Sequence, residues 1–267
     1  MNALEDNVSD ILGKAMRGRG FDAQEMASQT GLAPGRVEAL LQGTFEEPSA
    51  RLMAAILGLN PDAVARLGRN EYQPQVTKPA NLAQITTYYR DMAVNAYVLW
   101  DPDTRDAAIF DTGTDAAPVL EIIERQELEV VSIFLTHSHA DHVQALGALT
   151  AALDVEAWSS TFEPLPGTRT FRPGDFFNAG QHFIRTRHTP GHTSGGTTFV
   201  IEGSTLDAAV VGDALFAGSI GGVKKDYPES LEGIRREILT LPDSTIICPG
   251  HGPMTTVALE KANNPFF

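Results

Sequence analysis

Two kinds of hydrophobic pattern divide the chain. Beyond about residue 82, apolar runs of strand length alternate with segments of helical period, which predicts a layered α/β domain. The predicted strands cover residues 93–100, 107–110, 130–135, 182–187, 197–201, 208–211 and 245–247. The predicted helices cover residues 116–126, 144–150 and 231–239. Such a sheet is a rigid support from whose strand ends loops can project polar side chains.

The first seventy or so residues follow a different pattern. A small residue at Ala27, a turn glycine at Gly31 and an apolar contact at Val37 have the spacing of two short helices joined by a tight turn. This spacing resembles the helix-turn-helix domains of phage-repressor type. The second helix would cover residues 32–41, and further helices would cover residues 52–57 and 63–67.

Prolines separate these two regions. Between residues 73 and 81 they prevent either a helix or a central strand, so this segment is predicted to be a linker. The chain is therefore expected to have three parts: a helix-turn-helix-like helical domain over residues 1–72, a linker over residues 73–81 and an α/β catalytic domain over residues 82–267. The deletion of residues 1–75 is expected to change solubility or association more than chemistry, because this region has few cations.

The balance of charge limits the partners of this chain. With 34 acidic and 20 basic side chains, the formal net charge is −14, and no basic run reverses it locally. Polyanions are repelled by such a chain, which argues against nucleic acid or an anionic membrane as the main partner. Residues 1–70 carry seven basic and nine acidic side chains, with Glu38 on the predicted recognition helix. A structural role or homodimer formation is therefore favoured over DNA binding, and a small molecule is the expected substrate.

Two further features indicate the compartment. The amino terminus has no basic start followed by an apolar run of export-signal length, and no apolar stretch reaches the length of a membrane span. Cys248 is the only cysteine, so no internal disulfide can form. A cytoplasmic location is therefore predicted.

Three short motifs hold most of the seven histidines. Residues 136–142 read Thr-His-Ser-His-Ala-Asp-His, residues 188–192 read His-Thr-Pro-Gly-His, and residues 249–252 read Pro-Gly-His-Gly. A Gly-Asp pair at residues 212–213 lies between the last two motifs. Imidazole and carboxylate groups together suit zinc, iron and similar divalent ions, whereas calcium and magnesium prefer oxygen ligands throughout. The motifs predict a two-metal site.

In this order, the motifs resemble those of metallo-β-lactamase-fold hydrolases of the glyoxalase II-like group, over about residues 82–267. The resemblance implies an αββα sandwich of the short type, without a helical carboxy-terminal domain. It implies two divalent ions, zinc first, with iron or manganese as alternatives. The implied ligands are His137, His139 and His192 for the first ion, Asp141, His142 and His251 for the second, and Asp213 as a bridge between them. Asp141 and Asp213 are also the implied catalytic residues.

Other polar residues admit two interpretations each. Asp111 matches a family element and could orient a metal ligand from behind, but an ordinary turn at a strand end explains it equally well. Lys224 and Lys225 could contact an anionic group of the substrate, or they could be solvated surface lysines. His182 lies in a predicted strand and His188 precedes His192, so both are expected to be structural. Cys248 is expected to be a packed strand thiol.

A two-metal site of this kind favours acyl hydrolysis through a hydroxide that bridges the metals. A small-molecule thioester or ester is the preferred substrate, because a thiol leaves largely without a proton. At Gly222 the chain departs from the family that it resembles, in which arginine is frequent at this position, and this argues against specific use of glutathione thioesters. The main alternative is a mononuclear iron persulfide dioxygenase that uses His137, His192 and Asp213. A DNA-binding regulator with a metal-dependent sensor domain is a further alternative, and a nuclease or a β-lactam hydrolase is less favoured.

Overall fold

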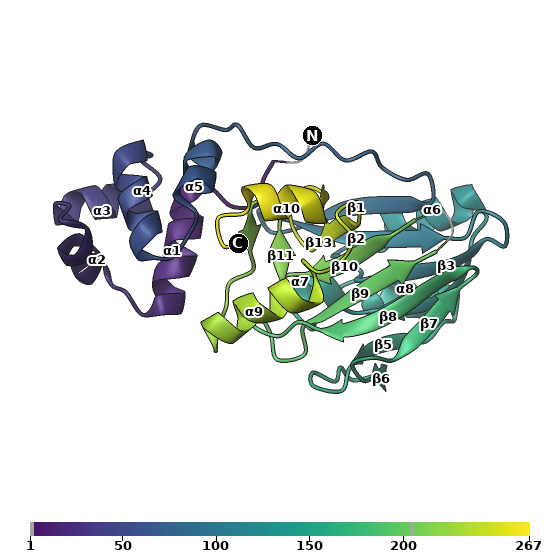
Figure 1. The fold of residues 1–267 in the computed structure, drawn as a ribbon. Helices are drawn as coiled ribbons and strands as arrows, with labels where there is room; N and C mark the ends of the chain where they lie inside the picture. The colour runs from purple at the N-terminus through teal and green to yellow at the C-terminus, as the bar shows by residue number, and fades with distance from the viewer. Residues whose placement is uncertain (1–2, 204–205) are drawn as a thin grey trace.

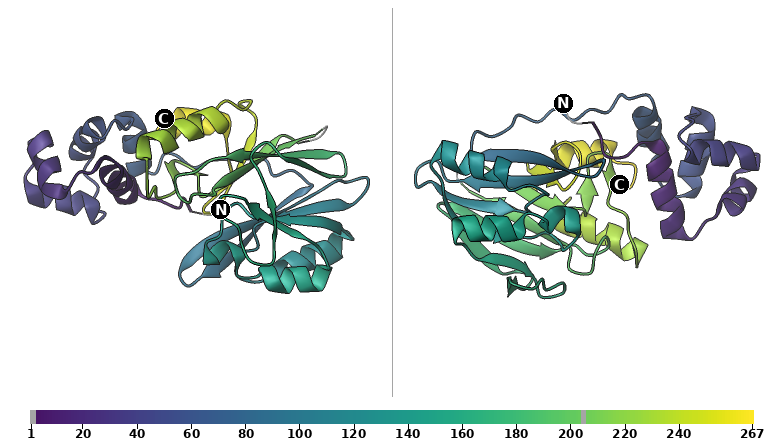
Figure 2. Two further views of the ribbon diagram at one scale, coloured as in Figure 1. Left: turned by 90° about the horizontal axis from the view of Figure 1, so that it is seen from below. Right: turned by 180° about the vertical axis from the view of Figure 1, so that it is seen from behind.

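Two sheets packed face to face form the body of the protein. The computed structural model describes residues 3–203 and 206–267. Each of the two main sheets has six strands, and helices cover both outer faces (Figures 1 and 2). This arrangement confirms the predicted α/β class and the αββα sandwich. Five helices near the amino terminus precede the sandwich and lie beside it (Figure 1).

The first sheet contains the strands that lead to the first histidine motif. Its order is β1-β2-β3-β4-β5-β6, antiparallel from β1 to β3 and parallel from β3 to β6. Its strands are β1 (Leu82–Tyr89), β2 (Met92–Trp100), β3 (Asp106–Phe110), β4 (Glu129–Phe134), β5 (Ala157–Ser160) and β6 (Arg169–Phe171). The helices between these strands are α6 (Ala117–Gln126), α7 (Ala140–Val143) and α8 (Leu146–Leu153).

The second sheet leads to the other motifs. Its order is β14-β13-β10-β9-β8-β7, and all its pairs are antiparallel except β10 with β13. Its strands are β7 (Phe176–Ala179), β8 (His182–His188), β9 (Thr197–Glu202), β10 (Ala208–Gly212), β13 (Ile246–Pro249) and β14 (Thr255–Thr256). A small hairpin of β11 (Leu215–Phe216) and β12 (Ser219–Ile220) follows β10. The helices α9 (Tyr227–Glu237) and α10 (Val257–Asn263) complete this half.

Alternating side chains explain why both faces of each sheet are buried. On β10, Ala208 and Val210 face the core between the sheets, whereas Ala209 and Val211 face the outer helices. Phe110, Phe134 and Phe199 pack together in the core between the sheets. The outer face of the first sheet is covered by α6 and α8 (Figure 2). Strands buried on both faces read as continuous apolar runs, which made them predictable.

The amino-terminal helices share a core with the second sheet. They are α1 (Val8–Arg19), α2 (Ala23–Thr30), α3 (Pro34–Leu41), α4 (Glu47–Ile56) and α5 (Pro61–Gly68). Their buried side chains join one cluster with those of α9, α10 and the outer face of the second sheet. Residues 71–81 contain no helix or strand, and β1 begins at Leu82. Buried side chains from both sides of the predicted boundaries at residues 72 and 82 belong to this one core. The boundaries therefore remain a prediction.

Some elements differ from those predicted. The predicted helix over residues 231–239 begins earlier, at Tyr227, and ends at Glu237. The predicted helix near residues 144–150 is divided, since α7 begins at Ala140 and α8 at Leu146. Neither α1 nor the short strands β5 to β7 was predicted. Among the described residues, no helix has the combined length and hydrophobicity needed to cross a membrane.

Candidate metal centre

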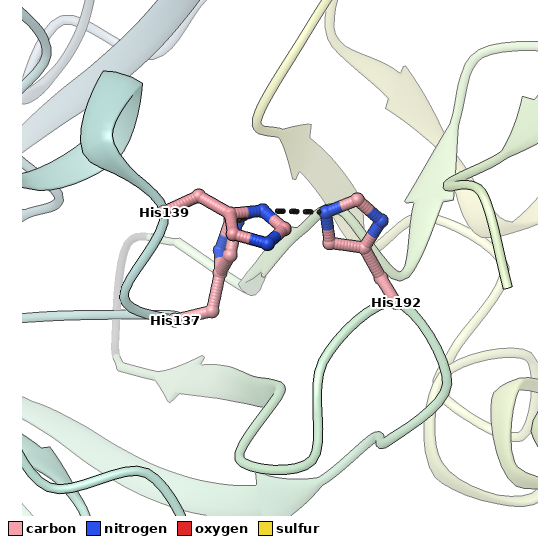
Figure 3. Close-up of side chains that lie close together, drawn as sticks. All are labelled: His137, His139 and His192. Carbon is pink, nitrogen blue, oxygen red and sulfur yellow. Dashed lines mark hydrogen bonds between the residues drawn. The ribbon is translucent and has the colours of Figure 1, made fainter. Parts of the chain in front are cut away.

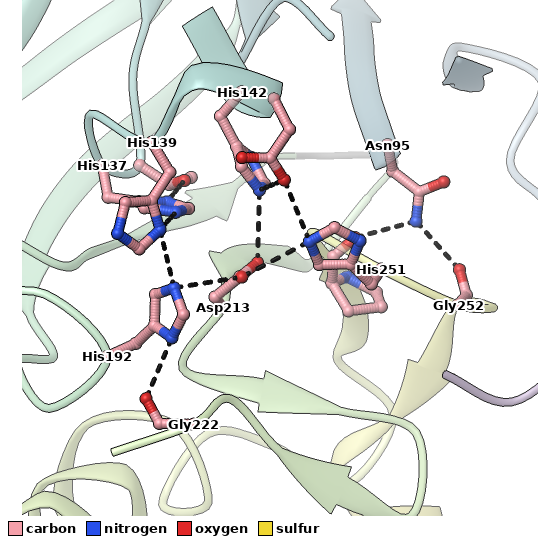
Figure 4. Close-up of polar contacts among 12 residues, drawn as sticks. Asn95, His137, His139, His142, His192, Asp213, Gly222, His251 and Gly252 are labelled. Carbon is pink, nitrogen blue, oxygen red and sulfur yellow. Dashed lines mark hydrogen bonds and ion pairs between the residues drawn. The ribbon is translucent and has the colours of Figure 1, made fainter. Parts of the chain in front are cut away.

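The predicted metal ligands meet at one edge of the sandwich, although they come from five separate parts of the chain (Figure 4). Each part follows a strand or begins a helix, so a regular element fixes its position. His137 and His139 follow β4, Asp141 and His142 lie on α7, His192 lies between β8 and β9, Asp213 follows β10, and His251 follows β13. These seven side chains form overlapping clusters of candidate ligand atoms. The structure thus brings all of them together, and their role as ligands remains a prediction.

Three imidazoles form the first half of the centre. His139 Nδ1 lies 3.1 Å from His137 Nε2 and 2.9 Å from His192 Nε2 (Figure 3). Rings held edge to face in this way point three nitrogens at a common position. Such a set of imidazole nitrogens is suited to zinc or iron.

The second half combines one carboxylate with two imidazoles. Asp141 Oδ2 lies 3.5 Å from His142 Nε2 and 3.4 Å from His251 Nε2. All three residues are buried. A mixed set of nitrogen and oxygen atoms again suits a borderline divalent ion rather than calcium.

Asp213 lies between the two halves. Its Oδ1 is 3.4 Å from His142 Nε2, and its Oδ2 is 3.3 Å from His192 Nε2 and 3.4 Å from His251 Nε2 (Figure 4). The carboxylate therefore reaches imidazoles of both halves. Gly250 permits this approach, because a Cβ atom there would lie 2.2 Å from Asp213 Oδ1.

The buried atoms of this centre fit a pair of cations. His142 Nε2 and Asp213 Oδ1 are buried and make no hydrogen bond within the described residues. Buried polar atoms that make no hydrogen bond are rare in folded proteins, so each such atom requires an explanation. Convergent nitrogens and carboxylate oxygens would be satisfied by a metal at this position. The residues present therefore fit two divalent ions.

Hydrogen bonds on the far side of the imidazoles fix their orientation. Asp111 Oδ2 accepts hydrogen bonds from His142 Nδ1 at 2.9 Å and from Thr136 Oγ1 at 2.8 Å. Thr136 Oγ1 in turn lies 3.0 Å from His137 Nδ1, so Asp111 holds one imidazole directly and another through a hydroxyl. The orienting role considered for Asp111 is therefore the one that the contacts favour. Outer partners of this kind select the ring tautomer that a metal needs.

Backbone carbonyls orient the other two outer nitrogens. His192 Nδ1 donates to the carbonyl of Gly222 at 3.0 Å, and His251 Nδ1 donates to that of Ala93 at 2.6 Å. Asn95 on β2 holds the turn that carries His251, because its Nδ2 donates to the carbonyls of Pro249 and Gly252. Asn95 was not predicted as a site residue. Its position inside an apolar strand, where asparagine is rare, is a signal that could have indicated it.

A second residue that was not predicted, Glu163, connects the two loops of the first half. Its Oε1 accepts from the backbone N–H of Ser138 at 3.0 Å and from the hydroxyl of the same residue. Its Oε2 accepts from the backbone N–H of Gly195 at 2.9 Å. Ser138 lies between two predicted ligands, and Gly195 lies three residues after His192. One carboxylate thus fixes the separation of these loops, and no local pattern around Glu163 indicates this contact.

The remaining predicted residues lie as follows. Lys224 Nζ is 3.2 Å from His139 Nε2, at the exposed mouth of the centre. Lys225, the next residue, is also exposed. His182 is buried away from the centre beside Asn81. His188 Nε2 lies 2.9 Å from the carbonyl of Ser194 and so braces the loop that carries His192. Cys248 is buried, and burial raises the pKa of its thiol.

Charge differs between the two halves of the centre. Burial lowers the pKa of His137 and of His192, which leaves both imidazoles neutral at neutral pH. Burial also lowers the pKa of His142, but Asp213 and Asp111 outweigh this effect and raise it to about 10. For His251, burial again lowers the pKa, whereas hydrogen bonds to Asp141 and Asp213 raise it to about 11. Without a metal, the second half therefore holds protons in place of a cation.

Metal loading is consequently expected to release about two protons per chain at neutral pH, one from His142 and one from His251. Because both pKa values lie above 6.5, protonation stabilises the ion-free fold below about pH 6.5, and this stabilisation is lost as the pH rises through about 10. The affinity for the second ion should therefore rise with pH between about 7 and 9. Calorimetric titration with zinc in buffers of different ionisation enthalpy measures the protons released. If no protons were released, the imidazoles of His142 and His251 would already be neutral before the metal binds.

An αββα sandwich whose edge gathers imidazoles and carboxylates into two adjoining clusters defines an α/β protein with a candidate metal centre. Residues 89–251 match the family model described as the metallo-beta-lactamase superfamily. The chain belongs to the metallo-beta-lactamase superfamily, as the motifs predicted. This fold implies the binding of divalent metals and the coarse function of a metallo-hydrolase.

Several characterised proteins are similar to this chain. A curated relative from Haemophilus influenzae, named hydroxyacylglutathione hydrolase GloC, is 34% identical over 197 residues, which cover 64% of this chain and 92% of the relative. The crystal structure of ETHE1 from Myxococcus xanthus is 27% identical, with a TM-score of 0.61, and the match covers 68% of this chain and 83% of that one. TTHA1623 in a di-iron-bound form is also 27% identical, with a TM-score of 0.56, and the match covers 68% of this chain and all of that one (100%).

Proposed function

We propose that this protein hydrolyses a small-molecule thioester or ester with the help of two divalent ions, zinc first, with iron or manganese as alternatives. The observation that supports this most strongly is the position of Asp213, whose two oxygens reach imidazoles of both halves within 3.4 Å. His137, His139 and His192 would hold the first ion, and Asp141, His142 and His251 the second. When bound, such ions lower the pKa of a water and polarise a carbonyl group.

The protein's own groups favour a substrate with a good leaving group. Hydrogen bonding from His251 lowers the pKa of Asp141 to about 2, although burial opposes this. The pKa of Asp213 also stays well below its ordinary value, because His142 and His251 outweigh the effect of burial. Neither carboxylate can therefore donate a proton at neutral pH. A thiol, with a pKa of about 8.5, can leave without that proton, whereas an alcohol or an amine is a much poorer leaving group without it.

No protein nucleophile is needed for this reaction. Cys248 is fully buried, and its raised thiol pKa makes it unreactive. The Lys224 ammonium, 3.2 Å from His139 Nε2 at the mouth of the centre, would contact an anionic group of the substrate. A cytoplasmic location is part of this proposal, since a lone cysteine suits a reducing compartment.

Metal content and two activities, measured on the same preparation, test the proposed function. We expect about two ions per chain and hydrolysis of a thioester at least about tenfold faster than that of the matched oxygen ester. Elemental analysis and thiol release provide these measurements. Oxygen uptake with a persulfide substrate is measured in parallel.

The matched control is the same protein after removal of its metals with a chelator and reloading with zinc or iron. Activity should disappear on removal and return on reloading. A content fixed at one iron per chain, with oxygen uptake and no thiol release, would favour the mononuclear persulfide dioxygenase. In that case His137, His192 and Asp213 would be its ligands.

A further inference from the structure

The helices that precede the sandwich contact the segment that follows the bridging carboxylate. We propose that the amino-terminal region, up to Tyr72, supports the metal centre. Its contacts hold residues 213–222 in place and thereby position Asp213, His192 and His251. The proposal rests on the two-ion function argued above. It assigns the helices a role in chemistry rather than in nucleic-acid binding.

Residues 213–222 touch three of the seven predicted ligands. The segment begins with Asp213 itself, and at its other end the carbonyl of Gly222 accepts the hydrogen bond from His192 Nδ1. Between them, the ring of Phe216 packs edge to face against the ring of His251, with centroids 5.5 Å apart. A displacement of this short hairpin would therefore move the bridge and disturb two imidazoles together.

Helix α1 holds one side of the hairpin through a buried ion pair. Lys14 Nζ donates to the carbonyl of Ile220 at 2.8 Å and pairs with Asp6. The Asp6 carboxylate also accepts from Ser219 Oγ at 2.5 Å. The side chains of Lys14 and Asp6 are only 13% and 8% exposed, and Lys14 Nζ lies 5.0 Å from the centroid of the Phe216 ring. Removal of one partner would leave the other charge buried without compensation.

Helix α5 and Tyr72, which follows it, hold the tip of the same hairpin. A Cβ atom added to Gly218 would lie 3.1 Å from Leu67 and 3.2 Å from Tyr72, so this turn is in close contact with both. The backbone N–H of Gly218 donates to Glu260 Oε2 at 2.9 Å, and the hydroxyl of Tyr72 donates to the other oxygen of the same carboxylate at 2.5 Å. Gly218 has a φ of 73°, which favours glycine at this point.

The chain before α1 supports the turn that carries His251. The backbone nitrogen of Glu5 lies 3.2 Å from the position that a Cβ atom of Gly252 would occupy. Figure 4 shows the purple amino-terminal ribbon passing beside Gly252. The family model begins at residue 89, so every contact made by the amino-terminal region has one partner outside the matched residues. The sequence led to the expectation that deletion of residues 1–75 would change solubility or association more than chemistry. These contacts lead us to expect instead that the deletion would weaken the metal centre.

The test uses the full chain with Lys14→Met or Asp6→Asn. The metal-free proteins are titrated with zinc alone against a competing chelator, at a temperature where circular dichroism shows them folded. We expect the weaker of the two zinc sites to lose affinity by about tenfold, because Asp213 and His251 are no longer held in position. The matched control is Arg125→Met, which breaks the exposed Arg125–Glu121 pair on α6, at the outer face of the first sheet, and should leave zinc affinity unchanged.

A merely structural role would lower the melting temperature without changing zinc affinity in the folded variants, and that result would overturn the proposal. If neither charge variant folds, Phe216→Leu tests the contact with His251 without leaving a buried charge. Unchanged zinc affinity in folded Phe216→Leu would also overturn it. The proposed function fails separately, if the wild-type protein binds two ions but does not release thiol from any thioester.

Discussion

Replacement of Asp213 by asparagine is expected to reduce turnover by more than about a hundredfold and to reduce the bound metal below two ions per chain. Loss of a partner that only orients a metal ligand costs about ten- to a hundredfold in metal affinity, and in the proposed centre Asp213 would contact both ions itself. Asparagine keeps the shape of the side chain but removes the negative charge that faces His142, His192 and His251. Metal content by elemental analysis and initial rates with a thioester provide the measurement.

The control for this variant is Asp207→Asn. Asp207 is exposed immediately before β10, the strand that ends at Gly212, so the control removes the same charge at the opposite end of that strand. It should leave both metal content and turnover unchanged. If Asp213→Asn bound two ions and retained its turnover, Asp213 could not be the bridge, and the two-ion proposal would lose its main support.

The positions of the predicted ligands follow from short motifs at strand ends. His137 and His139 are two residues apart in one loop, so their closeness is almost fixed by local geometry. Asp213 and His251 were predicted equally well because each follows an apolar strand, and adjacent parallel strands end at the same edge of a sheet. The sandwich itself follows from continuous apolar runs that need cover on both faces. Where a local pattern determines the position of a residue, the sequence alone is enough to predict that position.

Contacts between distant segments are encoded differently. Glu163 binds two loops that lie 25 and 32 residues away from it, and nothing in its own neighbourhood requires them to meet. Lys14 reaches Ile220 across 206 residues, so this contact depends on the docking of one region against another. The sequence did, however, contain a pattern that indicates the helix carrying Lys14. Apolar residues at positions 8, 11, 12, 15 and 16 have helical spacing, and Asn7 with Asp10 forms a capping box.

Replacement of Asp111 by asparagine is expected to weaken zinc binding by about ten- to a hundredfold, although Asp111 is not a predicted ligand. Its Oδ1 accepts from the backbone N–H of Thr136 at 2.8 Å, and an asparagine oxygen can keep this bond. The other position would then hold an NH₂ group facing His142 Nδ1 and Thr136 Oγ1, which both donate now. His142 would move its proton to Nε2, the atom that faces the centre, and could no longer offer a lone pair there.

Backbone strain would not explain weaker zinc binding by Asp111→Asn. Asp111 has a φ of 53°, in the left-handed region that asparagine tolerates as well as aspartate does. Asp106→Asn at the start of β3 is the matched control and should leave zinc affinity unchanged. Because Asp111 acts through His142, excess zinc should restore much of the turnover of Asp111→Asn. The same excess should not restore Asp213→Asn, which lacks the bridge itself. Equal rescue of both variants would show that the two carboxylates do not have these different roles.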